Sequence, residues 1–241
     1  MSGRRAKPSL PADQLTIVWQ SVSLLLDYPD EELIARVPLI RSASHRLPPG
    51  IGVSIRDFLG HLETTPLEEL QADYVETFDS RRRCNLFLTY FAHGDTRKRG
   101  MALLRFKQTY LRAGFELDPE PSRGAELPDH LCVVLEFAAT VDRRLGRDLM
   151  LDHRAGLELL RLSLKDLASP WAGLVDAVTA TLPPLRGDER DAVRRLAAEG
   201  PPEEEVGLAP FAAPAFSPGA ATGAAPEKTL LPMPSFPGAR G

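Results

Sequence analysis

Apolar residues recur at three- and four-residue spacing through most of the chain, from residue 13 to residue 182. This spacing lines one face of an α-helix, so it predicts a succession of amphipathic helices. The predicted helices cover residues 13–28, a segment that opens at residue 30, and residues 65–78, 95–114, 128–145, 149–167 and 170–182. We find no series of alternating β-branched segments bounded by turn residues, as strands would require. The pattern therefore predicts an all-α fold.

The start of two of these helices has a local signature. In His93-Gly94-Asp95, glycine can supply the positive φ of a tight turn, and Asp95 or Thr96 can cap the helix that follows. Pro128-Asp129 likewise predicts a helix start with Asp129 as the cap. The repeat of the helix at 95–114 is expected at Met101, Leu104 or Arg105, Gln108 and Leu111. That of the helix at 128–145 is expected at Leu131, Leu135, Ala138, Val141 and Leu145.

The connections between the helices are short, which favours antiparallel neighbours packed as a bundle. We expect a flexible N-terminus at residues 1–12 and a single all-helical domain at residues 13–198. Residues 199–241 contain nine prolines interleaved with glycine and alanine. Proline at this density opposes both helix and strand, and the few apolar residues cannot offset the entropy of ordering. This last segment is therefore predicted to be a disordered C-terminal tail.

Charge is distributed very unevenly. The stretch from Arg81 to Arg112 holds nine Lys or Arg and a single acid, so it carries +8, whereas the whole chain is at −4. Residues 61–80 contain several Asp and Glu but no Lys or Arg. Neighbouring segments of opposite sign suit a protein that binds a peptide with charged and apolar residues, although a solvated charged face gives the same pattern.

Signatures of catalysis are missing from the sequence. There is no phosphate-binding glycine loop, no Gly-x-Ser-x-Gly elbow and no pair of histidines at helical ligand spacing. Cys84 follows three arginines that would favour its thiolate, but a lone cysteine in a helical segment is more often a small core residue. We therefore predict neither catalytic residues nor a metal site.

Two cysteines are too few for a disulfide framework, and no apolar run approaches the roughly 20 residues that a bilayer-spanning helix needs. These features are typical of a cytoplasmic protein without a membrane-inserted segment.

Two motifs in this chain resemble those of a known family, the assembly chaperones of respiratory nitrate reductase (the delta subunit, NarJ-type). The first lies in the sequence FDSRRRCNLFLTYFAHGDTRKRG, from Phe78 to Gly100. The second is ELPDHLCVVLEF, from Glu126 to Phe137. The resemblance covers roughly Leu15 to Leu182 and implies a helical fold.

The resemblance also implies a function and a mechanism. Such a chaperone binds the N-terminal segment of the catalytic (alpha) subunit and holds that subunit open while molybdenum cofactor (molybdopterin guanine dinucleotide) is inserted. It binds no cofactor stably itself, is absent from the final enzyme, and has cofactor-delivery proteins as further partners. The residues expected to bind the client peptide are Asp79, Arg82, Phe87, Tyr90, Phe91, His93, Arg97, Arg99, Asp129, His130 and Glu136.

Arg97 and Arg99 stand where a helix dipole disfavours positive charge, which suggests a client or a fixed carboxylate as their partner, with Asp79 and Glu136 as the candidates. Two other functions remain open. One is proofreading of the twin-arginine signal of another molybdoenzyme, such as dimethyl sulfoxide or trimethylamine oxide reductase. The other is nucleic-acid binding through the +8 segment, against which stands the acidic remainder of the chain.

Overall fold

The computed structural model describes residues 10–117 and 127–200, and all of them belong to one compact unit. Within these residues the fold is all-α, as the periodicity predicts, and the only β-type pairing is an isolated bridge between Phe87 and His130. The helices are α1 (Ala12–Leu25), α2 (Glu31–Ser44), α3 (Pro49–Thr64), α4 (Leu67–Tyr74), α5 (Leu88–His93), α6 (Arg97–Arg112), α7 (Leu131–Thr140), α8 (Arg143–Asp152), α9 (Arg154–Asp166), α10 (Ala172–Ala180) and α11 (Gly187–Glu199). A π-helical turn (Val75–Asp79) extends α4, and a 3-10 turn (Arg82–Cys84) precedes α5.

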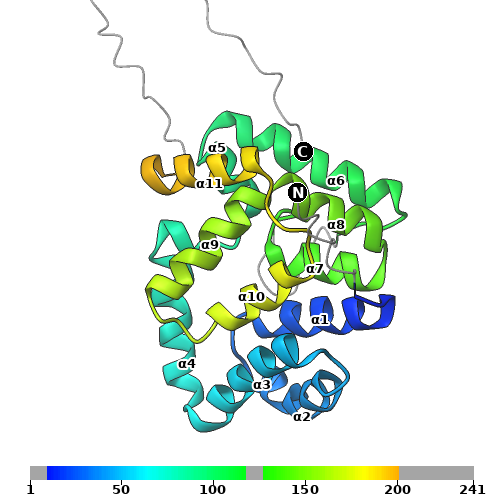
Figure 1. Cartoon of the computed structure of the whole chain (residues 1–241), viewed down its shortest axis with the longest axis vertical. Coiled ribbons are helices and arrows are strands. Elements are labelled where there is room, and N and C mark those ends of the chain that lie inside the picture. Colours follow the sequence, from blue (N-terminus) through cyan, green and yellow to red (C-terminus); the bar gives the residue numbers. More distant parts are fainter. Residues whose placement is uncertain (1–9, 118–126, 201–241) are drawn as a thin grey trace, which may run out of the picture. The chain divides into compact units, whose positions relative to one another are not determined.

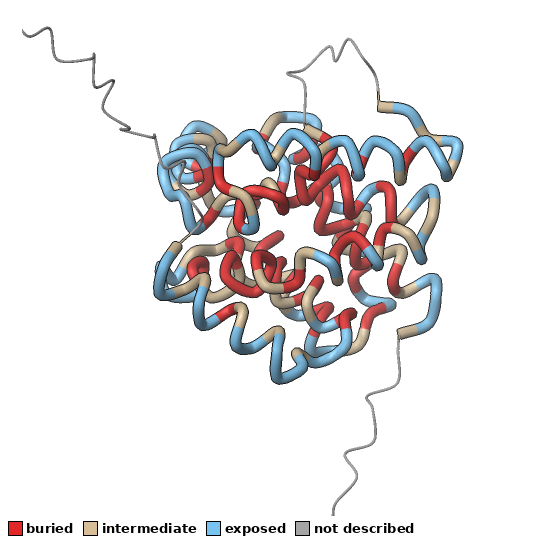
Figure 2. Tube along the Cα trace, turned by 90° about the horizontal axis from the view of Figure 1, so that it is seen from above, coloured by how far each residue is buried: buried red, intermediate tan, exposed pale blue. Residues whose placement is uncertain are grey.

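The core forms where α1 packs against α7 and α10, and where α10 packs against α3 (Figure 1). Trp19 of α1 is fully buried, and its indole Nε1 donates a hydrogen bond to Thr181 Oγ1 at 3.0 Å. Ser23 of α1 donates to the carbonyl of Cys132 in α7 at 2.8 Å. Buried positions face inward from every layer, with exposed positions on the outer sides of the helices (Figure 2). One continuous apolar core therefore fixes the positions of α5, α7 and α9.

Local signals at several helix ends are confirmed. Asp30 caps α2 by accepting a hydrogen bond from Leu33 N. Gly94 has φ +57° and Gly114 has φ +74°, a region that glycine adopts without a steric penalty. Thr96 is the N-cap of α6, but its hydroxyl caps no backbone N–H, and Asp95 instead pairs with Arg99 one turn on.

The predicted repeat of α6 is wrong about which face is buried. Ala102, Phe106 and Tyr110 face the core, whereas Met101 and Leu111 of the predicted stripe are 64% and 57% exposed. Both sets have helical spacing, so periodicity alone does not choose between them. The face with Phe106 and Tyr110 has more apolar area to bury, so it is the face that packs against the core.

Two helix boundaries also differ from the prediction. The helix expected at 128–145 stops at Thr140, and Asp142 caps a new helix by accepting from Leu145 N. The segment at 149–167 is divided at His153 between α8 and α9. The sequence pattern gave no separate range for α3 or α5, and it missed α11, of which only Val193 is buried. The predicted N-terminal segment 1–12 and tail 199–241 lie almost wholly outside the described residues.

Candidate functional site

Two segments about 40 residues apart meet at the start of α5. Leu88 N donates to the carbonyl of Asp129 at 3.0 Å, and Leu131 N donates to the carbonyl of Leu86 at 2.8 Å. The Asn85 side chain accepts from Phe87 N at 2.7 Å, which sets the turn that leads into α5. The two sequence motifs are therefore joined backbone to backbone.

Asp129 organises this junction. Its side chain is fully buried, and Oδ2 accepts from Thr89 N at 3.1 Å and from Thr89 Oγ1 at 2.5 Å. The prediction that Asp129 caps its own following helix is wrong. Its carboxylate satisfies a free N–H in the first turn of α5, and His130 takes the N-cap position of α7.

Arg99 brings the positive charge to this carboxylate. Its Nη2 lies 3.8 Å from Asp129 Oδ2, and its Nε donates to Thr89 Oγ1 at 3.3 Å. The guanidinium also binds Asp95 at 2.9 Å. Only 14% of the side chain is exposed. The partner of Arg99 is therefore Asp95 together with Asp129, and the expectation of Asp79 or Glu136 is wrong.

Aromatic rings enclose the Arg99 guanidinium. Its central carbon lies 5.2 Å from the Phe87 ring centroid and 5.9 Å from that of Tyr90, distances at which a cation is attracted to a ring face. The Phe87 ring in turn contacts His130 edge-on at 5.1 Å. A buried charge thus holds α5, α6 and the start of α7 in one arrangement.

Burial keeps the neighbouring titratable groups neutral. It lowers the pKa of His130 to about 4. Burial, reinforced by the Asp129 carboxylate, raises the pKa of Tyr110 well above its usual value. The Tyr110 hydroxyl therefore stays protonated and donates to the carbonyl of Pro128 at 2.6 Å, which fixes the approach to Asp129.

Acid should destabilise the fold through His130. Because its pKa is depressed on folding, the unfolded chain takes up a proton between about pH 6.5 and pH 4 that the folded protein does not. Stability is therefore present above pH 6.5 and is lost as the pH falls, by up to about 3 kcal/mol from this group. The variant His130→Phe keeps a ring against Phe87 and removes the titration. Urea unfolding should show a smaller acid loss in this variant, by about 2–3 kcal/mol.

The control for that experiment is His45→Gln, which replaces a histidine at an exposed position. Burial also lowers the pKa of His153, so part of the acid loss remains in His130→Phe. If the unfolding free energy of His130→Phe falls with pH as steeply as that of the wild type, His130 is not the source of the acid loss.

The structure gathers some of the predicted site residues and leaves others apart. Those in one cluster, the Asp129 cluster, are Phe87, Tyr90, Arg99, Asp129 and His130. Phe91 and His93 lie on the same short helix, α5. The remaining four, Asp79, Arg82, Arg97 and Glu136, are exposed on the surface. Whether any of these eleven residues contacts a client stays a prediction.

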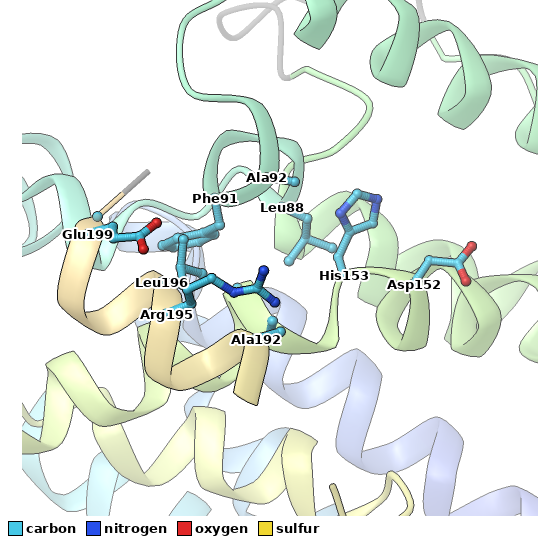
Figure 3. A pocket seen from close by; sticks show the side chains of 12 residues that line it. Leu88, Phe91, Ala92, Asp152, His153, Ala192, Arg195, Leu196 and Glu199 are labelled. Carbon is cyan, nitrogen blue, oxygen red and sulfur yellow. The ribbon is translucent and has the colours of Figure 1, made fainter. Parts of the chain in front are cut away.

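The opposite side of α5 opens onto a cavity of about 420 Å³. Its lining includes Leu88, Phe91 and Ala92 of α5 and Leu196 of α11, of which Leu88 and Phe91 are almost fully buried, and it is edged by Asp152, Arg195 and Glu199. Figure 3 shows Phe91 and Leu88 directed toward the side of α11 that carries Arg195 and Leu196, with His153 at one side. An apolar floor with charges of both signs at its rim fits an amphipathic segment.

Of the residues that line this cavity, the sequence analysis named only Phe91 as a site residue. Gly156 of α9 lets α5 approach so closely that a Cβ there would lie 2.7 Å from the Phe91 side chain. The other missed residues include His153, at a helix junction, and Arg195 and Leu196 of α11. The available signal was the i, i+4 pair Ala192 and Leu196 at the end of the predicted domain.

The described residues give little support for catalysis at this site. No group of three or more His, Cys, Asp or Glu in the described ranges is placed to hold a metal ion. Cys84 is buried, and burial raises the pKa of its thiol even though Arg81 acts in the opposite direction. A raised pKa disfavours the thiolate that a nucleophile needs. No helix within residues 10–117 and 127–200 combines the length and apolar character needed to cross a membrane.

Comparison with known proteins gives a consistent result. Residues 44–176 match the family model described as nitrate reductase delta subunit. The "Nitrate reductase-like protein NarX" of Mycobacterium tuberculosis is 40% identical over 176 residues, which are 70% of this chain and 25% of that protein. The chain thus spans about a quarter of the length of that relative.

Two shorter relatives match over most of their length. "Probable nitrate reductase molybdenum cofactor assembly chaperone NarJ" of Bacillus subtilis is 35% identical over 69% of this chain and 88% of its own. "Nitrate reductase molybdenum cofactor assembly chaperone NarJ" of Escherichia coli is 32% identical over 64% of this chain and 65% of its own. The Asp129 cluster and the α5 and α9 walls of the cavity all lie within residues 44–176.

Proposed function

Because this chain belongs to the nitrate reductase delta subunit family, we propose that it is a cytoplasmic assembly chaperone for a respiratory nitrate reductase. It binds the catalytic subunit through that subunit's N-terminal segment, assists insertion of molybdenum cofactor, and is absent from the final enzyme. It has no catalytic activity of its own. The names of the two NarJ relatives support this client over another molybdoenzyme.

The cavity beside α5 is the observation that carries the proposal. The cavity can take up apolar side chains from one side of an amphipathic client segment, and Asp152, Arg195 and Glu199 can meet charges along the segment's edges. The opposite face of α5 is fixed by Asp129 and Thr89, so the cavity wall is rigid before the client arrives. A preformed wall lowers the entropic cost of binding.

The mechanism is selective binding of one state of the client. A chaperone that binds the open, cofactor-accepting form and not the closed form shifts the client's population toward the open form. The shift is limited by the difference between the two affinities. Closure after cofactor insertion removes the exposed segment and releases the chaperone.

The test is binding of a synthetic peptide that copies the N-terminus of the catalytic subunit. Ala92→Phe places a ring at the mouth of the cavity from an exposed position of α5. We expect calorimetry to show binding of the full chain at micromolar concentration, weakened by about tenfold or more in Ala92→Phe. Ala198→Phe makes the same change on α11 away from the cavity lining and should bind normally.

Complementation extends the test to cells. In a strain that lacks its own chaperone, Ala92→Phe should fail to restore nitrate reductase activity, whereas Ala198→Phe should restore it. If no peptide binding appears at several hundred micromolar, the binding free energy is weaker than about 4 to 5 kcal/mol. That result would contradict the N-terminal segment as the ligand. Equal binding by both variants would contradict the cavity as the site.

A further inference from the structure

The outward face of α6 carries an apolar stripe that the fold leaves exposed. Met101, Leu104 and Leu111 are 64%, 46% and 57% exposed, although the helix buries its other side through Phe106 and Tyr110. Helix α6 lies at the outer edge of the unit (Figure 1). The stripe therefore contributes little to the core, and its exposed apolar area is available to a partner.

The stripe has the spacing of a coiled-coil seam. Met101, Leu104, Gln108 and Leu111 follow one another at intervals of three, four and three residues, which matches the a and d positions of two heptads. On the same register Arg105 and Arg112 occupy e positions and Lys107 occupies a g position. A complementary helix would meet cations along the seam.

These flanking cations are exposed, and they lack an acidic partner within the part of the chain that the structure describes. Arg105, Lys107 and Arg112 are all exposed, and none of them forms an ion pair with any residue in the described ranges. Helix α6 has no Asp or Glu anywhere from Arg97 to Arg112. Charge complementarity therefore requires an acidic partner.

The same residues disfavour other occupants. A second copy of the chain would set the cations of one α6 against those of the other, which is repulsive. A membrane-surface helix presents Trp, Phe and Leu to the lipid, and α6 offers it only one methionine and two leucines because both of its aromatics face the core. A nucleic-acid backbone would gain nothing from the methionine and leucines between the cations.

We propose that the outward face of α6 is a docking site for an acidic amphipathic helix of a partner protein. The partner helix supplies apolar residues at heptad a and d positions and Glu or Asp at its e and g positions. This site lies on a different helix from the cavity, and the proposal does not depend on the identity of the client.

The probe is a synthetic peptide of about three heptads, with Leu at a and d and Glu at e and g, labelled and kept dilute so that it stays monomeric. Fluorescence anisotropy with the full chain should show binding with a Kd of about 1–50 μM, severalfold weaker at high salt. The same peptide with Lys in place of Glu should not bind.

Two sets of variants test the face. The first variant combines Arg105→Glu, Lys107→Glu and Arg112→Glu. Its affinity for the Glu peptide should fall by about tenfold or more, and it should bind the Lys peptide instead. The matched control reverses three exposed cations elsewhere, Arg144→Glu with Arg190→Glu and Arg194→Glu, and should bind like the wild type. Met101→Ser with Leu104→Ser and Leu111→Ser should abolish binding with only a small fall in the melting temperature, because all three side chains are about half exposed or more and serine is only a slightly poorer helix former.

Several outcomes would overturn the proposal. If the Glu peptide does not bind the folded wild type, an acidic amphipathic helix is not the partner. If the Lys peptide binds as tightly as the Glu peptide, charge does not determine binding. Tighter retention of anionic vesicles or duplex DNA than of the peptide would assign the face to those surfaces. Binding that appears only after Asp118, Glu120 and Glu126 are neutralised would assign it to the chain's own acidic segment.

Discussion

Replacing Asp129 with alanine should lower the free energy of unfolding by about 3 to 5 kcal/mol, because the change removes one partner of a buried charge pair. Thr89 N and Oγ1 would lose their acceptor inside the core, and Arg99 would keep only the exposed carboxylate of Asp95. The midpoint of thermal unfolding should fall by roughly 6 to 20 °C for a domain of this size.

The matched control is Asp129→Asn, whose amide oxygen can still accept from Thr89 while the charge is gone. It should unfold between the alanine variant and the wild type. Arg99→Ala should cost more in the wild type than in Asp129→Asn, since only the wild type is left with a buried carboxylate that has lost its cation. If Asp129→Ala melts at the same temperature as the wild type, this carboxylate does not hold α5 in place.

The structure also revises an expectation about Arg97 and Arg99. From the sequence, either a client or a fixed carboxylate was expected as the partner of both arginines. Arg97 is exposed, but Arg99 is enclosed by Phe87, Tyr90 and Asp129. Loss of Arg99 should therefore destabilise the fold, and a role in binding has to be tested at Arg97 alone.

The second large effect is expected at Gly146, where α8 crosses α7. A Cβ at this position would lie 2.4 Å from Ala138 Cβ and 2.6 Å from Ala138 Cα. Neither contact can be relieved by rotating a side chain, so the two helices must separate. Gly146→Ala should destabilise the protein by about 3 kcal/mol, at the upper end of the usual cost of overpacking.

Gly60→Ala is the matched control, because it introduces the same methyl group in helix α3. Nothing lies within 4 Å of a Cβ at Gly60, and alanine is the better helix former by about 0.5–1 kcal/mol. The two glycine variants should therefore shift urea unfolding in opposite directions. A stabilising Gly146→Ala would show that the α7–α8 contact can yield.

Local patterns predicted most of the helical segments, but they gave α3 and α5 no range of their own, missed α11 and chose the wrong buried face for α6. In α6, apolar residues at helical spacing occur on two opposite faces, one with Phe106 and Tyr110 and one with Met101 and Leu111. A periodicity argument identifies a helix in either case. The choice of face depends on which neighbours the rest of the fold supplies, and that information is not local.

The Asp129 cluster shows the same division between local and tertiary information. Proline and aspartate before an apolar run correctly mark the approach to α7. The rule that such an aspartate caps the helix it precedes fails, because Asp129 reaches a helix start 40 residues earlier in the chain. Only the pairing of residues 86–88 with residues 129–131 brings that N–H within reach.

Helix α11 has a consequence for how the cavity is reached. It forms one wall through Ala192, Arg195 and Leu196, yet it buries only Val193 and lies beyond the stretch shared with the family model. A helix with so little buried area detaches at a small fraction of the free energy of global unfolding, so its amides should exchange with solvent long before those of α1 or α7. The wall contributed by α11 is thus the adjustable one, and sequence changes there can alter how readily the site opens while the shared core stays unchanged.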